Sequence, residues 1–272
     1  MEKIGLEKAY SSQIHLETRD GERFVVKNIP MEQVMNEVFF YQQLHEHHIP
    51  TLQAAEEEGK LVLKYVEKSK TLSDEETPEN FFILGQTLSS IHDIHFDSSF
   101  IIDERGHRQN IDWNDFIKSQ IEADEQAQKE KHGFTPEIIA RMTEIIKRDC
   151  PEVLKETCLV HGDLHSNNVL LDEGQLFIFD KDSIVAAGDP MIDFALLAIN
   201  YPGDIYDVGT EEEKRKDREL MKNFLSGYGK DIFEDRETLD AYVLLRSLER
   251  WPNPFERKIP EIVDKILAAN TL

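Results

Sequence analysis

The chain has 272 residues, enough for one large domain or for two lobes with a sizeable core. It carries 54 acidic and 31 basic residues, a formal net charge of -23, which disfavours nucleic acid and membrane as partners and favours a cationic small molecule. Two cysteines, no signal peptide and no apolar run of membrane-spanning length predict a cytoplasmic protein without disulfides.

The first quarter of the chain predicts a small antiparallel sheet with one helix. Alternating residues indicate two hairpins, which turn at 19–22 and at 57–59. Between them, apolar residues at i, i+4 spacing, such as Val34 and Val38, indicate a helix that follows Pro30. The expected strands are 12–18, 23–27, 52–56 and 60–66, and the expected helix is 31–46.

From residue 77 onward the pattern is mainly helical. The first helix, 81–92, has a core-facing apolar stripe, and His92 at its end is interpreted as a packing or capping residue. Asp189 is placed to cap a later helix that has Pro190 at its first position. The other expected helices are 113–131, 211–229, 234–249 and 256–269.

The segment His161–Asn168 reads His-Gly-Asp-Leu-His-Ser-Asn-Asn and places Asp163 and Asn168 five residues apart. Apolar runs on both sides of the turn 172–174 predict a hairpin, which brings Asp180 back beside Asn168. Two carboxylates and an amide oxygen then converge, and such oxygen ligands suit Mg²⁺. The arrangement follows the phosphoryl-transfer template, in which one Asp orients the acceptor hydroxyl while an Asn and a later Asp hold metal.

The same template requires a strand lysine that binds nucleotide phosphates and a helical glutamate that orients it. Lys27 ends the second expected strand, and both Glu32 and Glu37 lie on the helix that follows. Glu37 is one turn further into the helix and is the preferred partner.

The motif His-Gly-Asp-Leu-His-x-x-Asn resembles that of the aminoglycoside phosphotransferase and choline kinase superfamily. Leu-Gly-x-x-Leu-x-x-Ile-His, which ends at His92, and Gly-Asp-Pro-x-x-Asp, at 188–193, are similar to further landmarks of that superfamily. The resemblance covers about residues 10 to 250. It implies an α+β, two-lobed protein-kinase-like fold, with a nucleotide-binding lobe at 1–66 and a mainly helical catalytic and acceptor-binding lobe at 67–272.

The resemblance also implies the roles of individual residues. Asp163 is the expected catalytic residue, and Asn168 and Asp180 are the expected Mg²⁺ ligands. Asp193 would brace the catalytic loop through backbone hydrogen bonds. The residues expected to bind the nucleotide, ATP or GTP, are Lys27, Glu37, the hinge residues Lys64, Tyr65 and Val66, and Ser11 and Ser12, which stand where a glycine-rich loop is usual.

The acceptor is expected to be a small molecule with a hydroxyl group, bound between the 113–131 helix and the helices after 211. An aminoglycoside-type antibiotic is favoured, which would make the protein a resistance enzyme; choline or ethanolamine, thiamine, homoserine and sugar derivatives stay open. Acidity favours a cation, which Trp113 or Trp251 could face. The candidate acceptor-binding residues are His165, Asp182, Arg246, Glu249 and Trp251. A monomer or weak dimer is expected.

Three other functions share features with this sequence. His161 and His165 could bind a transition metal if they lay on a helix, but the flanking strand signals indicate a loop. Gly-Asp-x-His also occurs in metallophosphoesterases, whose further Gly-Asn-His block is absent from this chain. A catalytically silent kinase-like binding or coat protein is the third, and the presence of all five template residues argues against it.

Overall fold

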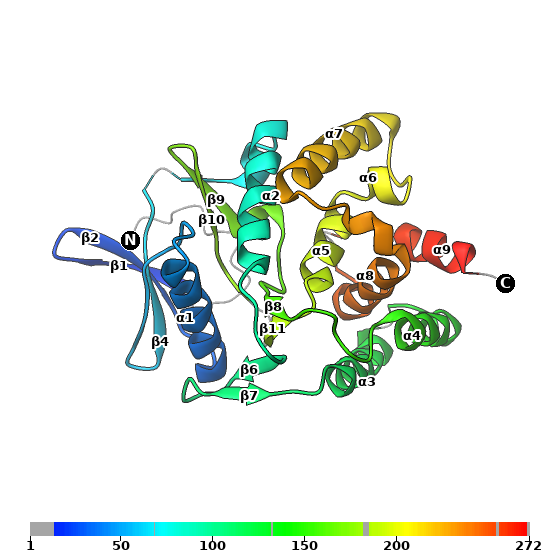
Figure 1. The fold of residues 1–272 in the computed structure, drawn as a ribbon, viewed down its shortest axis with the longest axis horizontal. Coiled ribbons are helices and arrows are strands. Elements are labelled where there is room, and N and C mark those ends of the chain that lie inside the picture. Colours follow the sequence, from blue (N-terminus) through cyan, green and yellow to red (C-terminus); the bar gives the residue numbers. More distant parts are fainter. Residues whose placement is uncertain (1–13, 68, 132, 182–184, 254–255, 271–272) are drawn as a thin grey trace.

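The structure is a computed structural model, which describes residues 14–67, 69–131, 133–181, 185–253 and 256–270 (Figure 1). Its N-terminal part is a four-stranded antiparallel sheet in the order β1-β2-β4-β3, with the helix α1 beside it. Both predicted hairpins and the predicted helix are confirmed. The bounds are β1 Ile14–Arg19, β2 Glu22–Lys27, α1 Met31–Glu46, β3 Ala54–Glu57 and β4 Lys60–Lys64.

Two further small sheets lie in the second part of the chain. The predicted hairpin is present as β9 (Val169–Asp172) and β10 (Gln175–Ile178), and β5 (Lys70–Thr71) adds a third strand on the β9 side. The other sheet, in the order β7-β6-β11-β8, was not predicted. Its strands are β6 Phe100–Ile102, β7 Arg108–Asn110, β8 Cys158–Leu159 and β11 Val185–Gly188.

Helices make up most of the second part, as predicted. Their starts follow ordinary capping chemistry: Thr77 and Thr135 each accept a hydrogen bond from a backbone N–H of the first turn, and a proline follows each of them. The helix after Thr135 was missed at the sequence level. The helices are α2 Pro78–His92, α3 Trp113–Lys131, α4 Pro136–Asp149, α5 Met191–Asn200, α6 Pro202–Ile205, α7 Glu211–Tyr228, α8 Arg236–Arg250 and α9 Ile259–Ala269.

The helix α5 lies at the centre of the helical part (Figure 1). It is buried almost all round, from Ile192 to Ile199. It begins at Met191, one residue later than predicted, and Asp189 accepts a hydrogen bond of 3.0 Å from the Met191 N–H. The central position matters for function because α5 carries Asp193. No helix in the described ranges is both long and apolar enough to cross a membrane.

The helices α2 and α7 pack against each other at two glycines. A Cβ atom added to Gly85 would lie 2.1 Å from the backbone oxygen of Phe224, and one added to Gly227 would lie 2.0 Å from that of Phe82. Real Cβ contacts are never this short, and a backbone oxygen cannot rotate away. The glycines therefore set the closeness of the two helices.

We expect Gly85→Ala to destabilise the protein by about 2 kcal/mol or more, because the added methyl group forces α2 and α7 apart. In a helix without such a contact, the same change stabilises by about 0.5–1 kcal/mol, so even the sign of the effect is informative. Urea unfolding measures it. Ser90→Ala, at an exposed position of α2, is the control and should change stability by less than about 0.5 kcal/mol. A stabilised Gly85→Ala protein would contradict the close packing.

Candidate active site

The loop that carries the motif is fixed by one buried carboxylate. Asp193, fully buried on α5, accepts hydrogen bonds from the backbone N–H groups of His161 (2.9 Å) and Gly162 (2.5 Å). His92 contacts the same carboxylate at 3.1 Å, and its other ring nitrogen lies 2.9 Å from the Tyr228 hydroxyl. The predicted bracing by Asp193 and the packing role of His92 are both confirmed.

His161 holds the loop from the other side. Its Nε2 lies 2.9 Å from the Phe179 carbonyl oxygen, to which it must donate, and its Nδ1 accepts a hydrogen bond of 3.2 Å from the Asp163 N–H. Burial lowers the pKa of His161 to about 4, so the ring is neutral. Because both nitrogens are occupied and His165 also lies outside any α-helix, the two histidines do not form a transition-metal pair.

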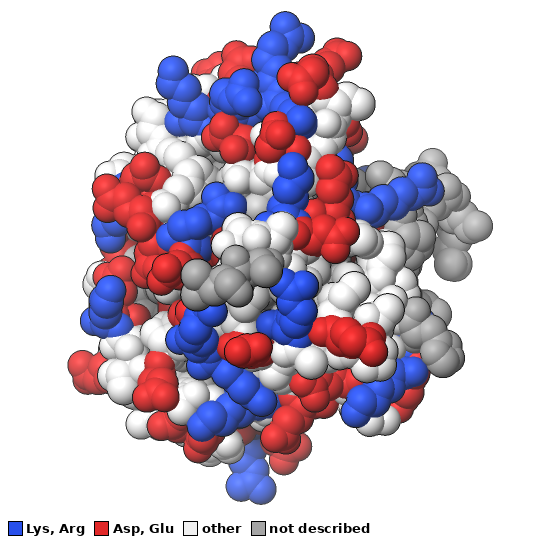
Figure 2. Space-filling view, turned by 90° about the vertical axis from the view of Figure 1, so that its right-hand side faces the viewer, with Lys and Arg blue, Asp and Glu red and all other residues white. Residues whose placement is uncertain are grey.

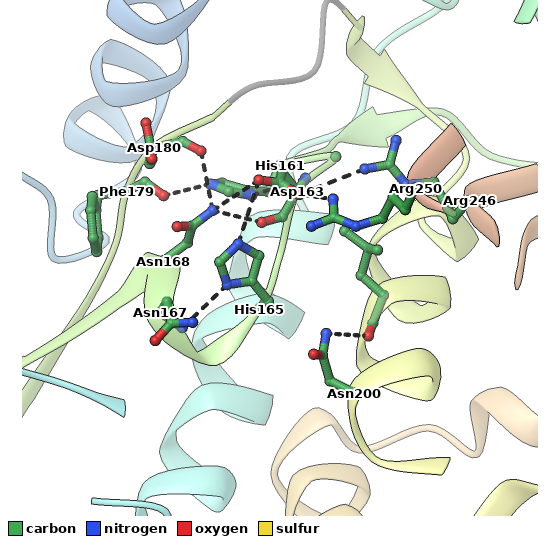
Figure 3. A network of polar contacts seen from close by, with 12 residues as sticks. His161, Asp163, His165, Asn167, Asn168, Phe179, Asp180, Asn200, Arg246 and Arg250 are labelled. Atoms are coloured by element: carbon green, nitrogen blue, oxygen red, sulfur yellow. Dashed lines mark hydrogen bonds and ion pairs between the residues drawn. The ribbon is translucent and has the colours of Figure 1, made fainter. Parts of the chain in front are cut away.

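The carboxylate of Asp163 is contacted from two sides (Figure 3). Its Oδ2 accepts a hydrogen bond of 3.1 Å from Asn168 Nδ2 and lies 3.6 Å from His165 Nε2. Its Oδ1 accepts one of 2.8 Å from Arg250 Nη1 and lies 3.6 Å from Arg246 Nη2. Burial alone would raise the pKa of Asp163, but His165 and the two guanidinium groups outweigh it and hold the pKa well below its usual range.

The hairpin β9–β10 returns the chain as predicted. The Phe179 N–H donates to the Asn168 carbonyl oxygen (3.0 Å), and Asn168 Nδ2 lies 3.4 Å from the carbonyl oxygen of Asp180. Asp180 has φ 62°, a left-handed conformation that is rare for a residue with a side chain, and its carboxylate is 46% exposed. The predicted return of Asp180 beside Asn168 is therefore confirmed for the backbone: Asn168 contacts the Asp163 carboxylate and the Asp180 carbonyl oxygen, whereas the Asp180 carboxylate contacts Lys27.

The expected ion pair between Lys27 and Glu37 is also present. Lys27 Nζ lies 3.0 Å from Glu37 Oε1 and 2.5 Å from Asp180 Oδ1, so it joins α1 to the end of the hairpin. Burial lowers the pKa of Lys27, but the two carboxylates outweigh it and raise the pKa, which keeps the ammonium charged. The Tyr41 hydroxyl donates to Glu37 (3.3 Å) and accepts from the Asp180 N–H (3.2 Å). Glu32, the alternative partner, is exposed.

Mg²⁺ fits the oxygen atoms found here. The amide oxygen of Asn168 accepts no hydrogen bond from the described residues, and the Asp180 carboxylate is half-exposed. No cluster of three His, Cys, Asp or Glu side chains that could hold a metal occurs in the described part of the chain. A site with one carboxylate and one amide is still suitable, because Mg²⁺ is often held by one or two protein groups together with phosphates and water.

The hinge is less open to a nucleotide than expected. The Lys64 N–H donates to the Gln53 carbonyl oxygen and the Tyr65 N–H donates to that of Arg23, both at 2.9 Å. These two amides cannot donate to adenine while the sheet is intact, which leaves Val66 of the three predicted residues as the donor. Three other predicted site residues, Ser11, Ser12 and Asp182, lie outside the described residues.

The side on which the acceptor is expected to bind is formed by α8 and α3. Arg246 and Glu249 form an ion pair of 2.5 Å, and Arg250, which the sequence analysis did not identify, contacts Asp163. The sequence could have indicated Arg250, because it lies one helical turn after Arg246 and so on the same face of α8. Trp251 is partly buried against Phe134, with ring centroids 6.1 Å apart.

The prediction that Trp113 could face a ligand is wrong. The side chain is buried, with 4% of the residue exposed, and the indole N–H donates a hydrogen bond of 2.8 Å to the Tyr242 hydroxyl. An indole needs such a partner when it is buried, and Tyr242 supplies it inside the core. Trp113 therefore anchors the start of α3 and has no face left for a cation.

Asp124 on α3 is a further charged group that the sequence analysis missed. Only 9% of it is exposed, and burial together with the negative charge of Glu249 raises its pKa to about 7. Its electrostatic neighbours Arg246 and Lys131 only partly oppose this shift. A carboxyl group with this pKa is partly protonated at neutral pH, and Arg246 is among the charged groups around it.

Comparisons with known proteins agree with this geometry. Residues 5–242 match the model of a phosphotransferase enzyme family. No protein of the curated collection matches the sequence. Choline kinase LicA from Streptococcus pneumoniae is similar at 17% identity, with 96% of this chain and 91% of that chain covered and a TM-score of 0.65. A thermostable mutant of aminoglycoside phosphotransferase APH(4)-Ia, in a ternary complex with ADP and hygromycin B, is similar at 17% identity, with 98% and 97% covered and a TM-score of 0.62. Amicoumacin kinase hAmiN, in complex with AMP-PNP and Ca²⁺, is similar at 16% identity, with 97% and 92% covered and a TM-score of 0.58. At these identities the likeness concerns the fold, and it confirms the predicted two-lobed kinase-like fold.

We expect Asp124→Asn to stabilise the protein above neutral pH. A carboxyl whose pKa is about 7 when folded and about 3.9 when unfolded binds more protons in the folded state, so the wild type loses stability as pH rises between these values. The advantage of the variant should therefore grow from pH 4 to 7 and level off at about 1–3 kcal/mol. Urea unfolding across pH measures it. Glu122→Gln, at an exposed position of α3, should show no such trend, and a pH-independent effect of Asp124→Asn would contradict the shifted pKa.

Proposed function

The chain belongs to the phosphotransferase enzyme family, and we propose that it transfers the γ-phosphoryl group of ATP or GTP to a hydroxyl group of a small molecule. One observation carries the proposal: Asn168 contacts both the Asp163 carboxylate and the backbone of Asp180, and Lys27, held by Glu37, reaches the Asp180 carboxylate from β2. These are the parts that phosphoryl transfer needs.

The residues on the nucleotide side would act mainly through charge. Lys27, fixed by Glu37, would bind the phosphates, and its present contact with Asp180 would give way to them. Asn168 and Asp180 would hold Mg²⁺, which when bound neutralises phosphate charge. The nucleotide or nucleotide analogue in two of the similar structures supports this assignment.

Asp163 would orient the acceptor hydroxyl. Its lowered pKa makes it a weak base, so it would hold the hydroxyl by a hydrogen bond and accept the proton late, after the bond to phosphorus has largely formed. Such a role needs an accurate position more than basicity. The braces from Asp193 and His161 to the loop supply that position.

The identity of the acceptor is the finer part of the proposal. The similar structures are a choline kinase, a hygromycin B complex and an amicoumacin kinase, which keeps both an antibiotic and a choline-like acceptor open. The acid excess led us to expect a cation. On the face drawn in Figure 2, however, acidic and basic side chains are interspersed, so the excess is not concentrated over one site there. The charges beside Asp163 are the better guide to the acceptor.

We expect the purified protein to bind MgATP or MgGTP, and Lys27→Ala to weaken this binding about tenfold or more, because the lysine would contact the phosphates. Titration calorimetry measures the affinity, and thermal unfolding shows whether the variant is folded. Lys60→Ala, in the neighbouring strand β4, is the control and should bind nucleotide as the wild type does. No binding of either nucleotide at millimolar concentration would favour the catalytically silent alternative.

We expect Asp163→Asn to lower kcat about a hundredfold or more and to leave nucleotide affinity within a few-fold, since Asp163 would touch the acceptor and not the phosphates. Asp180→Ala should instead weaken Mg²⁺-dependent nucleotide binding. Glu173→Gln, an exposed change at the tip of the same hairpin, should do neither. The assay couples nucleotide consumption to a panel of hydroxyl acceptors. Equal loss of nucleotide affinity in both aspartate variants would show that the roles are misassigned.

A further inference from the structure

Two arginines flank the point where the acceptor hydroxyl would bind. Arg246 and Arg250 are four residues apart on α8 and so project from the same face of the helix. Their side chains are only 12% and 20% exposed, and both reach Asp163. Figure 3 shows them on the opposite side of Asp163 from Asn168 and Asp180. They therefore belong to the acceptor side of the site, not to its metal side.

The two oxygens of Asp163 serve these two sides separately. Oδ2 accepts from Asn168 on the metal side, and Oδ1 accepts from Arg250 on the α8 side. A hydroxyl that approaches Asp163 from α8 must share or replace the Arg250 contact. It would then lie beside both guanidinium groups, and so would whatever group the acceptor carries next to that hydroxyl.

One edge of the Arg246 guanidinium is not fully used. Nη1 binds Glu249 at 2.5 Å, whereas Nη2 lies 3.6 Å from Asp163 Oδ1, too far for a good hydrogen bond. Nε is buried and has no hydrogen-bond partner among the described residues. In a guanidinium, Nε–H and Nη2–H form one edge, and this edge matches the two oxygens of a carboxylate or phosphate. The available donors therefore point to an anion.

The other charged groups around the pair fix its orientation. Glu249 binds Arg246, and Glu256 binds Arg250 through Nε at 2.5 Å. Gln128 on α3 donates to the backbone oxygens of Leu248 and Trp251, which holds the last turn of α8 in place. The guanidinium groups are thus preorganised, and preorganisation favours binding because little freedom is lost.

From this geometry, and on the premise of the proposed function, we infer that the acceptor carries a carboxylate or phosphate group close to its reacting hydroxyl and that Arg246 binds this group through Nε and Nη2. Arg250 supports it from the neighbouring turn. An ammonium group in the same place would face two guanidinium groups at short range.

The first test compares acceptors that differ only in this group. The pairs are glycerate and glycerol, 4-hydroxybutyrate and 1,4-butanediol, serine and ethanolamine, and glycerol 3-phosphate and glycerol. Turnover is followed by nucleotide consumption with Mg²⁺, and binding in the presence of MgADP is followed by ligand-observed NMR. We expect a carboxylate or phosphate member to exceed its partner at least about tenfold in kcat/KM or in affinity. Equal values, a preference for the neutral or cationic members, or no binding by any anionic member would overturn the inference.

The second test uses variants of Arg246 with the anionic member of the best pair. Arg246→Gln should raise its KM or Kd about tenfold or more and should affect the KM or Kd of the neutral member much less, so that the preference for the anionic member is lost. Arg246→Lys keeps the charge but lacks the two-donor edge, so it should lose most of the same affinity. If Arg246→Lys instead kept the full affinity for the anionic member, binding through Nε and Nη2 would be refuted, because lysine offers only a point charge. Arg236→Gln, at the partly exposed start of α8, is the matched control for loss of one ion-paired arginine, and thermal unfolding checks all variants for folding.

The two proposals fail in different ways. Nucleotide binding and the slow hydrolysis of ATP by water are measured on the same samples. If neither occurs, the proposed function fails. If nucleotide binds and no anionic compound is preferred, the phosphotransferase stands and only the anionic acceptor is refuted.

Discussion

The contact between the Asp193 carboxylate and the backbone of the catalytic loop is the one on which the rest of the site depends. A fully buried carboxylate is costly unless hydrogen bonds satisfy it, and here two loop N–H groups and His92 do so. The carboxylate needs the loop N–H groups, and the loop is in turn held by the carboxylate. The loop cannot leave without exposing the charge to an apolar core, so the position of Asp163 is set by the first turn of α5 and not by the loop itself.

A second set of contacts joins the two lobes at Asp180. Lys27 and Tyr41 both reach it, from β2 and α1, across more than a hundred residues of sequence. Because Glu37 touches both Lys27 and Tyr41, the helix α1, the sheet and the hairpin end form a single polar network. The end of the hairpin is therefore tied to α1 and to β2 by direct polar contacts.

The parts of the fold that the sequence predicted are those with a local signal. The hairpin that returns Asp180, the helix that carries Glu37 and the 113–131 helix each combine clear periodicity with turn or capping residues. The four strands of the third sheet have only two to four residues, too few for a periodic pattern. The helix α4 had both an N-terminal Thr135-Pro136 signal and an apolar stripe and could have been found. The sequence therefore contained enough local information to predict α4.

The site residues also divide into those with a local sequence signal and those without one. Lys27, Glu37 and Asp180 are placed by local elements and a known template, whereas Arg250 and Asp124 matter only because α8 and α3 pack where they do. No local pattern reports that packing, and the burial of Trp113 against Tyr242 depends on it as well. Asp163 itself is contacted by a different part of the chain at each carboxylate oxygen: Asn168 donates to Oδ2, and Arg250 donates to Oδ1. Under the proposed function, residues 161–180 would supply the side that faces the phosphates, and a helix some seventy residues later would supply the side that faces the acceptor. Substitutions in α8 would then redirect the enzyme to a new compound without rebuilding its phosphoryl-transfer machinery, which makes this helix the natural place to begin engineering a different selectivity.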